Sequence, residues 1–209
     1  MITVDCTRPS KLFRYSEYQW AVKSLLEGEF RLVPASDYRD LEADRARQDD
    51  ELVRRQTSRG EDVVIKNLST GQPIDVIGDV NYRQEVGTNY YTICMSSAWD
   101  PLLFDEFKGS TSCLIIHNTN EFCELVHHHV DNVLKGWGGW DAAVSYLSKS
   151  PHGPAFSKPW TYLTQKEWRF AWLPPERTQK LEPLFIRLGS IERFAELVMR
   201  PEAPSPENG

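Results

Sequence analysis

The stretch Lys158-Pro-Trp-Thr-Tyr-Leu-Thr-Gln-Lys-Glu-Trp-Arg-Phe-Ala-Trp172 is the part of the chain from which we predict the fold, and it contains three of the seven tryptophans. From Glu167 to Trp172, charged and apolar side chains alternate with the two-residue period of a half-buried strand. Gln165 and Glu167 are two residues apart and point the same way, between large aromatic residues that can exclude water. A solvated strand end is one interpretation; a catalytic carboxylate beside an amide is the other.

The length of 209 residues predicts one domain, which we place at residues 1–200. Residues 201–209 hold three prolines and no large apolar side chain, so we expect a disordered tail there. We find neither an internal repeat nor a second domain.

Charge and cysteine content exclude several classes of protein. A net charge of -6 argues against a general nucleic-acid coat, although a local basic patch stays open. Because the four cysteines form no Cys-x-x-Cys pair, we expect reduced thiols and no zinc. Successive residues of a helix fan out by ~100°, so His127, His128 and His129 cannot converge on one metal ion and form a solvated face.

Targeting signals are not recognisable in this sequence. The first residues lack a charged segment followed by a long apolar run, and no apolar stretch is long enough to cross a bilayer. We therefore expect a cytoplasmic protein with no membrane partner, while export without a cleaved signal stays open.

The first third of the chain predicts a strand, a helix and a second strand. A capping box at Ser16–Gln19 opens a helix that runs to Glu27 and ends at Gly28, and Glu29–Val33 forms the strand that follows. We predict that Trp20, Leu25 and Leu26 form the buried stripe of this helix.

Arg14 ends the first strand. It is either an exposed edge residue, which the local sequence favours, or a guanidinium that grips a diphosphate.

The next third is strongly charged before it becomes apolar. Residues 36–55 predict a solvated helix or lid, and residues 56–60 a loop. A hairpin is expected where Val63–Lys66 and Ile74–Ile77 flank a turn. Tyr90–Ser97 predicts a buried strand that ends in two hydroxyls, which either line a site or satisfy a turn.

The remaining elements are expected at the following positions: a strand at Cys113–His117, a helix capped by Asn120, a helix or strand at Trp140–Leu147, a strand at Leu184–Leu188, and a helix capped by Ser190 with Ile191, Phe194, Leu197 and Val198 on one side.

The order Arg14, Ser96 and Gln165-x-Glu167 resembles the Arg–Ser–Glu signature of the ADP-ribosyltransferase superfamily, which clostridial C3-like toxins and arginine-modifying ectoenzymes share. The resemblance is closest to a little-characterised bacterial family with Cys-Phe-Ser and Glu-x-Glu-Tyr-Arg motifs. It spans roughly Leu12 to Ile186 and is carried by the short motifs Phe13–Tyr15, Ala35–Glu42, Cys94–Ser96, Leu103–Gly109 and Trp160–Arg169.

The chain departs from these patterns at three places. Ser96-Ser97-Ala98 replaces Ser-Thr-Ser, and Leu103-Phe104 replaces Met-Trp. Gln165 stands where the related family often has glutamate. In the superfamily, glutamate at this position accompanies transfer to arginine, whereas glutamine accompanies other acceptors, including asparagine and nucleobases.

The resemblance implies an α+β fold with a split β-sheet core and peripheral helices, and NAD as substrate without a metal. Glu167 then stabilises the oxocarbenium-like state, Arg14 holds a phosphate, and Ser96 orients Glu167 or the ribose, while Gln165 positions the acceptor. Arg169 is expected to pair with a carboxylate or face the cleft. The residues expected to stack on nicotinamide or adenine are Tyr38, Phe104 and Tyr162.

The implied function is mono-ADP-ribosyl transfer from NAD to a protein, RNA or DNA acceptor, as in a bacterial toxin or anti-phage effector with an antitoxin partner. Two alternatives stay open: an NAD glycohydrolase, whose acceptor is water, and a non-catalytic module that binds a nucleotide or a protein. Acceptor specificity is expected in the surface segments at residues 37–59 and 136–154.

Overall fold

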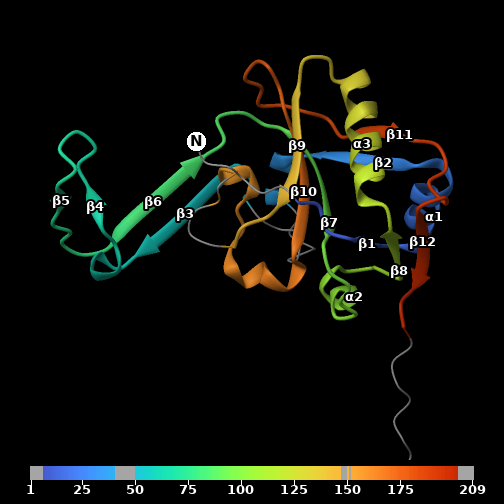
Figure 1. Ribbon diagram of the computed structural model, residues 1–209, viewed down its shortest axis with the longest axis horizontal. Coiled ribbons are helices and arrows are strands. Elements are labelled where there is room, and N and C mark those ends of the chain that lie inside the picture. The colour runs from blue at the N-terminus through green and yellow to red at the C-terminus, as the bar shows by residue number, and fades with distance from the viewer. Residues whose placement is uncertain (1–6, 41–49, 147–149, 151, 202–209) are drawn as a thin grey trace, which may run out of the picture.

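The computed structural model describes residues 7–40, 50–146, 150 and 152–201. An eight-stranded sheet, in which all the neighbouring strands are antiparallel, forms the body of the molecule (Figure 1). The elements, in chain order, are β1 (Leu12–Ser16), α1 (Tyr18–Glu27), β2 (Glu29–Pro34), η1 (Ala35–Asp40), β3 (Val53–Ser58), η2 (Gly60–Asp62), β4 (Ile65–Lys66), β5 (Pro73–Ile74), β6 (Val80–Glu85), β7 (Tyr91–Ser96), α2 (Leu103–Glu106), β8 (Ser112–Ile116), α3 (Thr119–Val133), β9 (Gly138–Ala143), η3 (Pro154–Phe156), η4 (Trp160–Gln165), β10 (Glu167–Leu173), β11 (Leu184–Arg187) and β12 (Ala195–Met199).

The sheet branches at β7. On one edge, β7 pairs along its whole length with β10, which in turn pairs with β9. On the other edge it has two partners: Val33 and Pro34 of β2 lie opposite one end, and Phe13 of β1 lies opposite the other. Among the described strands, none pairs with residues 93–95 on this edge, because β1 and β2 diverge there. The branch through β1 continues to β8 and β12, and the branch through β2 ends at β11.

One face of the sheet holds the largest apolar core. Trp168, Phe170 and Trp172 alternate along β10 and project to this face, where α3 covers them. The ring of Phe122 from α3 meets that of Phe170 edge to face, with the ring centroids 6.0 Å apart. Burying these aromatic rings fixes the register of β10, since a one-residue slip would turn all of them to the opposite face, where Glu167 and Arg169 lie.

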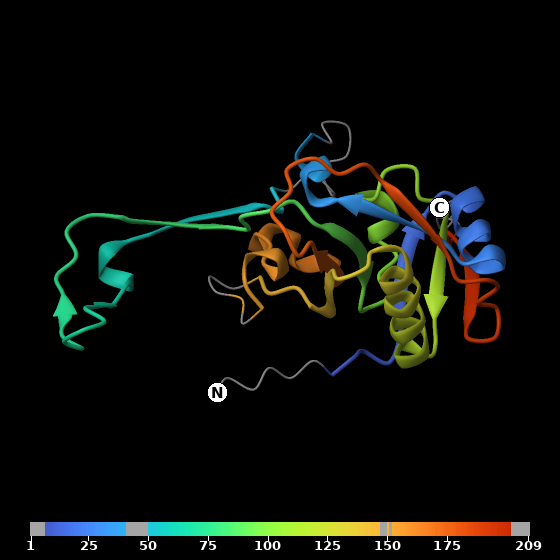
Figure 2. The ribbon, with the colours of Figure 1, turned by 90° about the horizontal axis from the view of Figure 1, so that it is seen from above.

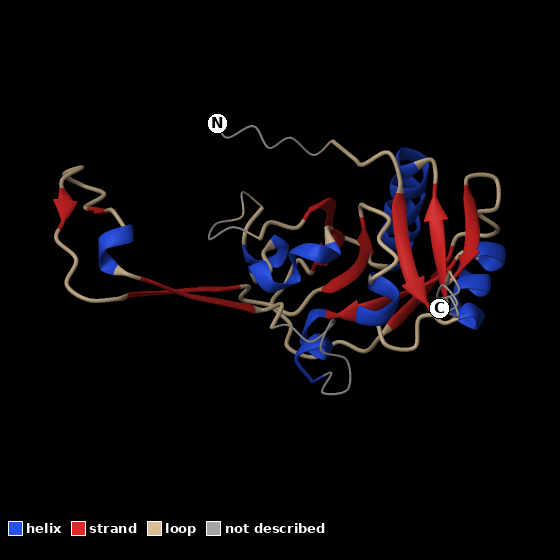
Figure 3. Cartoon of the chain, turned by 90° about the horizontal axis from the view of Figure 1, so that it is seen from below, coloured by secondary structure: helices blue, strands red, loops and turns tan. Residues whose placement is uncertain are grey.

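A long two-stranded arm projects from the body. β3 and β6 pair over six residues each, and the short β4–β5 hairpin with η2 lies at the far end (Figures 2 and 3). At the root, Leu52 and Val86 pack against an apolar cluster that contains Tyr90 and Phe156. The far end exposes large apolar side chains, with Leu68 and Ile77 102% and 99% exposed.

Several predicted elements are confirmed. The strands at β2, β7 and β10 occur as expected, and α1 ends at Gly28, which adopts a left-handed conformation with φ of 63°. The predicted hairpin is present, although only Ile65–Lys66 and Pro73–Ile74 pair. The fold is a single domain of mixed α+β class.

Other predictions are wrong. Trp20 and Leu26 are exposed, and α1 buries Ala21 and Ser24 instead. The segment after Ser190 forms β12, because its apolar side chains complete the sheet beside β8. The expected loop at residues 56–60 is largely β3, while much of the predicted charged lid and nearly all of the predicted tail lie outside the described residues.

Candidate active site

A cleft of about 540 Å³ opens where β1 and β2 diverge from β7. Its walls come from β1, α1, β2, η1, β7 and the segment that leads into β10. Five of the residues selected from the sequence line this one cleft, namely Arg14, Tyr38, Ser96, Gln165 and Glu167. A cleft of this size, lined by both aromatic and charged side chains, is typical of small-molecule sites.

Phe104 and Tyr162 are not among the residues that line the cleft. Phe104 is 1% exposed, and its ring packs edge to face on Tyr15 with centroids 4.9 Å apart, so it is a core residue and its expected role in ligand stacking is wrong. The ring of Tyr162 lies 4.8 Å from the ammonium nitrogen of Lys158 and so contacts the site through that lysine.

A tight turn delivers Gln165 and Glu167 to the cleft. Gln165 ends η4 and Glu167 begins β10, and Lys166 between them has a φ of 40°, in the left-handed region that non-glycine residues rarely adopt. Both side chains accept a hydrogen bond from the Lys158 ammonium, at 3.0 Å for Gln165 Oε1 and 3.1 Å for Glu167 Oε2. The expectation that the two side chains point the same way is therefore confirmed.

Glu167 belongs to a buried chain of alternating charges. Arg169 Nε donates to Glu167 Oε1 at 2.6 Å, and the two terminal nitrogens of the same guanidinium donate to the two carboxylate oxygens of Glu51. Lys158 binds the other oxygen of Glu167. The order along the chain is Glu51, Arg169, Glu167, Lys158, and each of the four is no more than 4% exposed.

This arrangement keeps the catalytic candidate ionised. Burial alone disfavours the charged form of Glu167, but attraction to Arg169 and Lys158 outweighs it and holds the pKa of Glu167 well below its usual range. Burial also raises the pKa of the neighbouring Cys94 thiol to about 12. Cys94 therefore stays protonated near neutral pH, and Glu167 is the charged group of this pair.

Ser96 lies directly opposite Glu167 in the β7–β10 register. Its hydroxyl donates to the carbonyl of Ala98 at 2.8 Å, and the oxygens of Glu167 accept from Lys158 and Arg169. Ser96 is thus the cross-strand neighbour of the carboxylate, and two cations hold the carboxylate in position.

Arg14 lies on the opposite wall. Phe13 is paired with Ser96 and shares its face of the sheet, so the side chain of Arg14 projects from the other face. Its guanidinium carbon lies 5.0 Å from the centroid of the Phe30 ring, and the residue lines the cleft because the cleft passes through the opening between β1 and β2. Arg14 and Glu167 therefore face the same space from different faces of the sheet.

The sequence pattern missed two participants, Glu51 and Lys158, and gave no sign that Arg169 is buried. Glu51 falls in the segment interpreted as a wet surface, and Arg169 falls at an alternating position interpreted as solvent-facing, yet both are buried. Lys158 opens the selected stretch and was given no role. One signal for these buried charges was available. The charged residues of β10 share a face of the sheet with Ser96, so a site on that face predicts that buried residues of opposite charge pair with them. Arg169 does pair with a carboxylate, as expected.

Within the described ranges, no three His, Cys, Asp or Glu residues are arranged to hold a metal ion. None of the helices there is both long and apolar enough to cross a membrane. No family model, curated protein or solved structure matches this chain.

Proposed function

We propose that this chain binds NAD in the cleft, breaks the bond between nicotinamide and ribose, and transfers ADP-ribose to a macromolecular acceptor. The observation that carries the proposal is the placement of Glu167: an ionised carboxylate, beside Gln165 and opposite Ser96, in a cleft whose other wall bears Arg14. Arg14, Ser96 and the pair Gln165 and Glu167 come from three parts of the chain that are far apart in sequence.

The chemistry needs a negative charge at this place. When the carbon–nitrogen bond breaks, its electron pair goes to the nicotinamide ring, and positive charge develops on the ribose between C1′ and the ring oxygen. A fixed carboxylate that accepts a hydrogen bond from a ribose hydroxyl stabilises that charge as it forms. The acceptor nucleophile then bonds to C1′ and releases its proton to water. Glu167 is the carboxylate in this scheme.

Binding is assigned to the remaining residues of the cleft. Arg14 contacts a phosphate of NAD, since a guanidinium presents paired donors that match phosphate oxygens. Tyr38 offers an aromatic face to a base. Burial raises its pKa well above the usual range, so its hydroxyl stays neutral. Gln165, which lines the cleft beside Glu167, meets the acceptor by hydrogen bonding, and that acceptor is a protein, RNA or DNA.

The test is nicotinamide release from labelled NAD by purified protein, with and without a cell lysate that supplies protein and nucleic acid. Glu167→Gln is expected to lower kcat by ~100- to 1,000-fold, because one group that stabilises developing charge is removed. Glu176→Gln, which changes an exposed glutamate after β10, serves as the matched control and retains full activity.

Label that remains on a lysate component identifies a transferase, and protease or nuclease treatment then gives the acceptor class. Release of free ADP-ribose without labelled product identifies a glycohydrolase. If wild type and Glu167→Gln are equally inert under every condition, the proposal is wrong. NAD binding without nicotinamide release then identifies a non-catalytic module.

A further inference from the structure

Lys158 is the one buried lysine among the residues that the structure describes, at 4% exposed. Its ammonium donates to Gln165 and to Glu167, and the ring of Tyr162 lies 4.8 Å away. Burial of a lysine is costly unless the charge is paired and hydrogen-bonded, so a lysine here needs a reason beyond packing.

Backbone contacts also hold Lys158 in place, independently of its side chain. The amide of Lys158 donates to the carbonyl of Ser145 at 3.0 Å, next to a bridge between Ser145 and Ser157, and Pro159 restricts the backbone directly after it. The backbone of Lys158 is therefore anchored to the segment that follows β9, while the two groups that its ammonium binds belong to η4 and β10.

We propose that Lys158 is a positioning residue of the cleft, whose ammonium holds Gln165 and Glu167 side by side against the reacting ribose and the acceptor. The proposal rests on the function proposed above. A lysine suits this task because one ammonium carries three donors, two of which satisfy the amide and the carboxylate at once. Catalysis depends on such placement, since a shift of ~1 Å costs ~100-fold in rate.

A second effect is electrostatic. The groups that face Glu167 are Arg169 on its own strand, Cys94 on β7, Tyr38 on η1, Glu51 before β3, Lys158, and Tyr146, whose hydroxyl accepts from the Glu167 amide. Arg169 and Lys158 are the two cations of this set. Both favour the ionised carboxylate, so removing Lys158 raises the pKa of Glu167. Activity that needs the carboxylate ionised is lost as the pH falls through this pKa, so the acid limb of the pH profile moves to higher pH.

The experiment compares kcat, KM and the pH profile of nicotinamide release for wild type, Lys158→Met and Lys180→Met. Lys158→Met is expected to lower kcat ~100-fold with KM nearly unchanged, and to shift the acid limb upward. Lys180→Met is the matched control: it removes an exposed lysine that does not line the cleft and leaves both parameters unchanged. A rise in KM alone would assign Lys158 to substrate binding and overturn the positioning role.

Two further variants separate the loss of positioning from a loss of activity caused by misfolding. Lys158→Ala is expected to regain activity with ethylammonium, which carries donors, and none with tetramethylammonium, which has no donor. Gln165→Met keeps the lysine and its pairing with Glu167, and is expected to fold and to lose less activity than Lys158→Met. Equal recovery of activity with both cations, or no recovery with either one in a folded variant, contradicts the proposal.

A titration separates this proposal from the proposed function. The pKa of Glu167 is measured by ¹³C NMR of glutamate-labelled protein, with the resonance assigned through Glu167→Gln. If wild type releases no nicotinamide but Lys158→Met or Lys158→Ala still raises the pKa of Glu167 and shifts the Gln165 amide signals, the function proposal fails while Lys158 still positions both groups. If both signals are unchanged in the folded variants, the Lys158 proposal fails, whatever the activity.

Discussion

Arg169 is the residue whose loss is expected to destabilise the fold most. Its guanidinium is fully buried and lies between two carboxylates, Glu51 and Glu167, so Arg169→Met leaves two buried negative charges facing each other. Breaking a buried ion pair by removing one partner costs ~3–5 kcal/mol in the free energy of unfolding. Urea unfolding followed by circular dichroism measures this loss.

The control at the residue scale is Arg187→Met. Arg187 also binds a glutamate, Glu29, at 2.9 Å, but its side chain is 70% exposed. An exposed pair contributes only ~0–1 kcal/mol. Similar losses for the two variants would mean that the buried chain of charges contributes no more to stability than a surface pair.

At the scale of elements, the end of α1 depends on one glycine. Gly28 has a φ of 63°, and a β-carbon there would overlap the carbonyl oxygen of Gly189, which precedes β12. Gly28→Ala therefore adds a backbone clash to the ~1–2 kcal/mol cost of a left-handed alanine. Gly71→Ala is the control, because Gly71 has a φ of 70° with no atom within 4 Å of the added carbon. Thermal unfolding is expected to show the larger loss for Gly28→Ala; equal losses would show that the clash relaxes freely.

Asp141 on β9 forms hydrogen bonds with three separate parts of the body. Its oxygens accept from Arg8 near the N-terminus, from Trp168 on β10 and from His127 on α3 at distances between 2.9 and 3.0 Å. Burial opposes its ionisation, but His127 and Arg8 outweigh burial and hold the pKa of Asp141 well below the usual range.

The direction of the pH effect follows from this lowered pKa. The carboxylate contributes stability above the unfolded pKa of ~3.9 and loses it as the pH falls toward the folded value. Asp141→Asn is therefore expected to be less stable than wild type at pH 7, and the gap in the free energy of unfolding narrows below pH ~4. Asp131→Asn, on the exposed side of α3, is the control. A gap that stays constant with pH would contradict a role for the ionised form.

The elements that the sequence predicted correctly are those whose residue pattern depends on local interactions. The period of β10, the apolar run of β7 and the left-handed end of α1 at Gly28 are each visible within a few residues. The sequence failed to predict β12, because a short apolar segment suits a helix or a strand equally and only its neighbour β8 decides. It selected the cleft residues Arg14, Ser96 and Glu167, and could not reveal Glu51, because burial of that carboxylate depends on an arginine 118 positions away.

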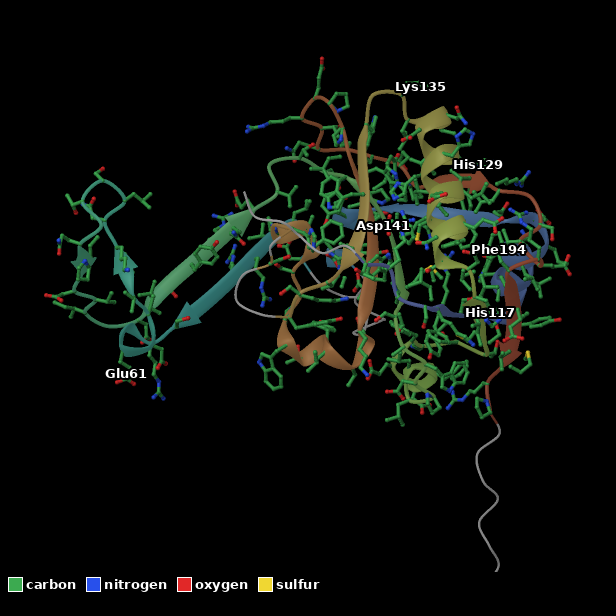
Figure 4. The ribbon with its side chains drawn as sticks, viewed as in Figure 1. Glu61, His117, His129, Lys135, Asp141 and Phe194 are labelled. Atoms are coloured by element: carbon green, nitrogen blue, oxygen red, sulfur yellow. The ribbon has the colours of Figure 1, made fainter. Side chains whose placement is uncertain are left out.

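At the scale of the molecule, the body and the arm are stabilised differently. The body buries aromatic side chains on a branched sheet, whereas in the described part of the chain the arm is held by the pairing of β3 with β6 and by the contacts of Leu52 and Val86 at its root. Glu61, in η2 beyond the end of β3, lies well away from Asp141 in the body (Figure 4). Glu51, which binds Arg169, lies two residues before β3, so the arm begins beside the charged chain of the cleft.

A two-stranded ribbon without a core is marginally stable in water, so the arm is expected to open locally while the body stays folded. Hydrogen–deuterium exchange should show amides of β3 and β6 exchanging far faster than those of β7 and β10. Leu68→Ser and Ile77→Ser, which alter exposed side chains at the far end, should change the free energy of unfolding by less than ~0.5 kcal/mol. If the amides of the arm are as protected as those of β10, this prediction is wrong. If that protection is then lost on dilution, a second copy covers the arm, because only such a contact depends on concentration.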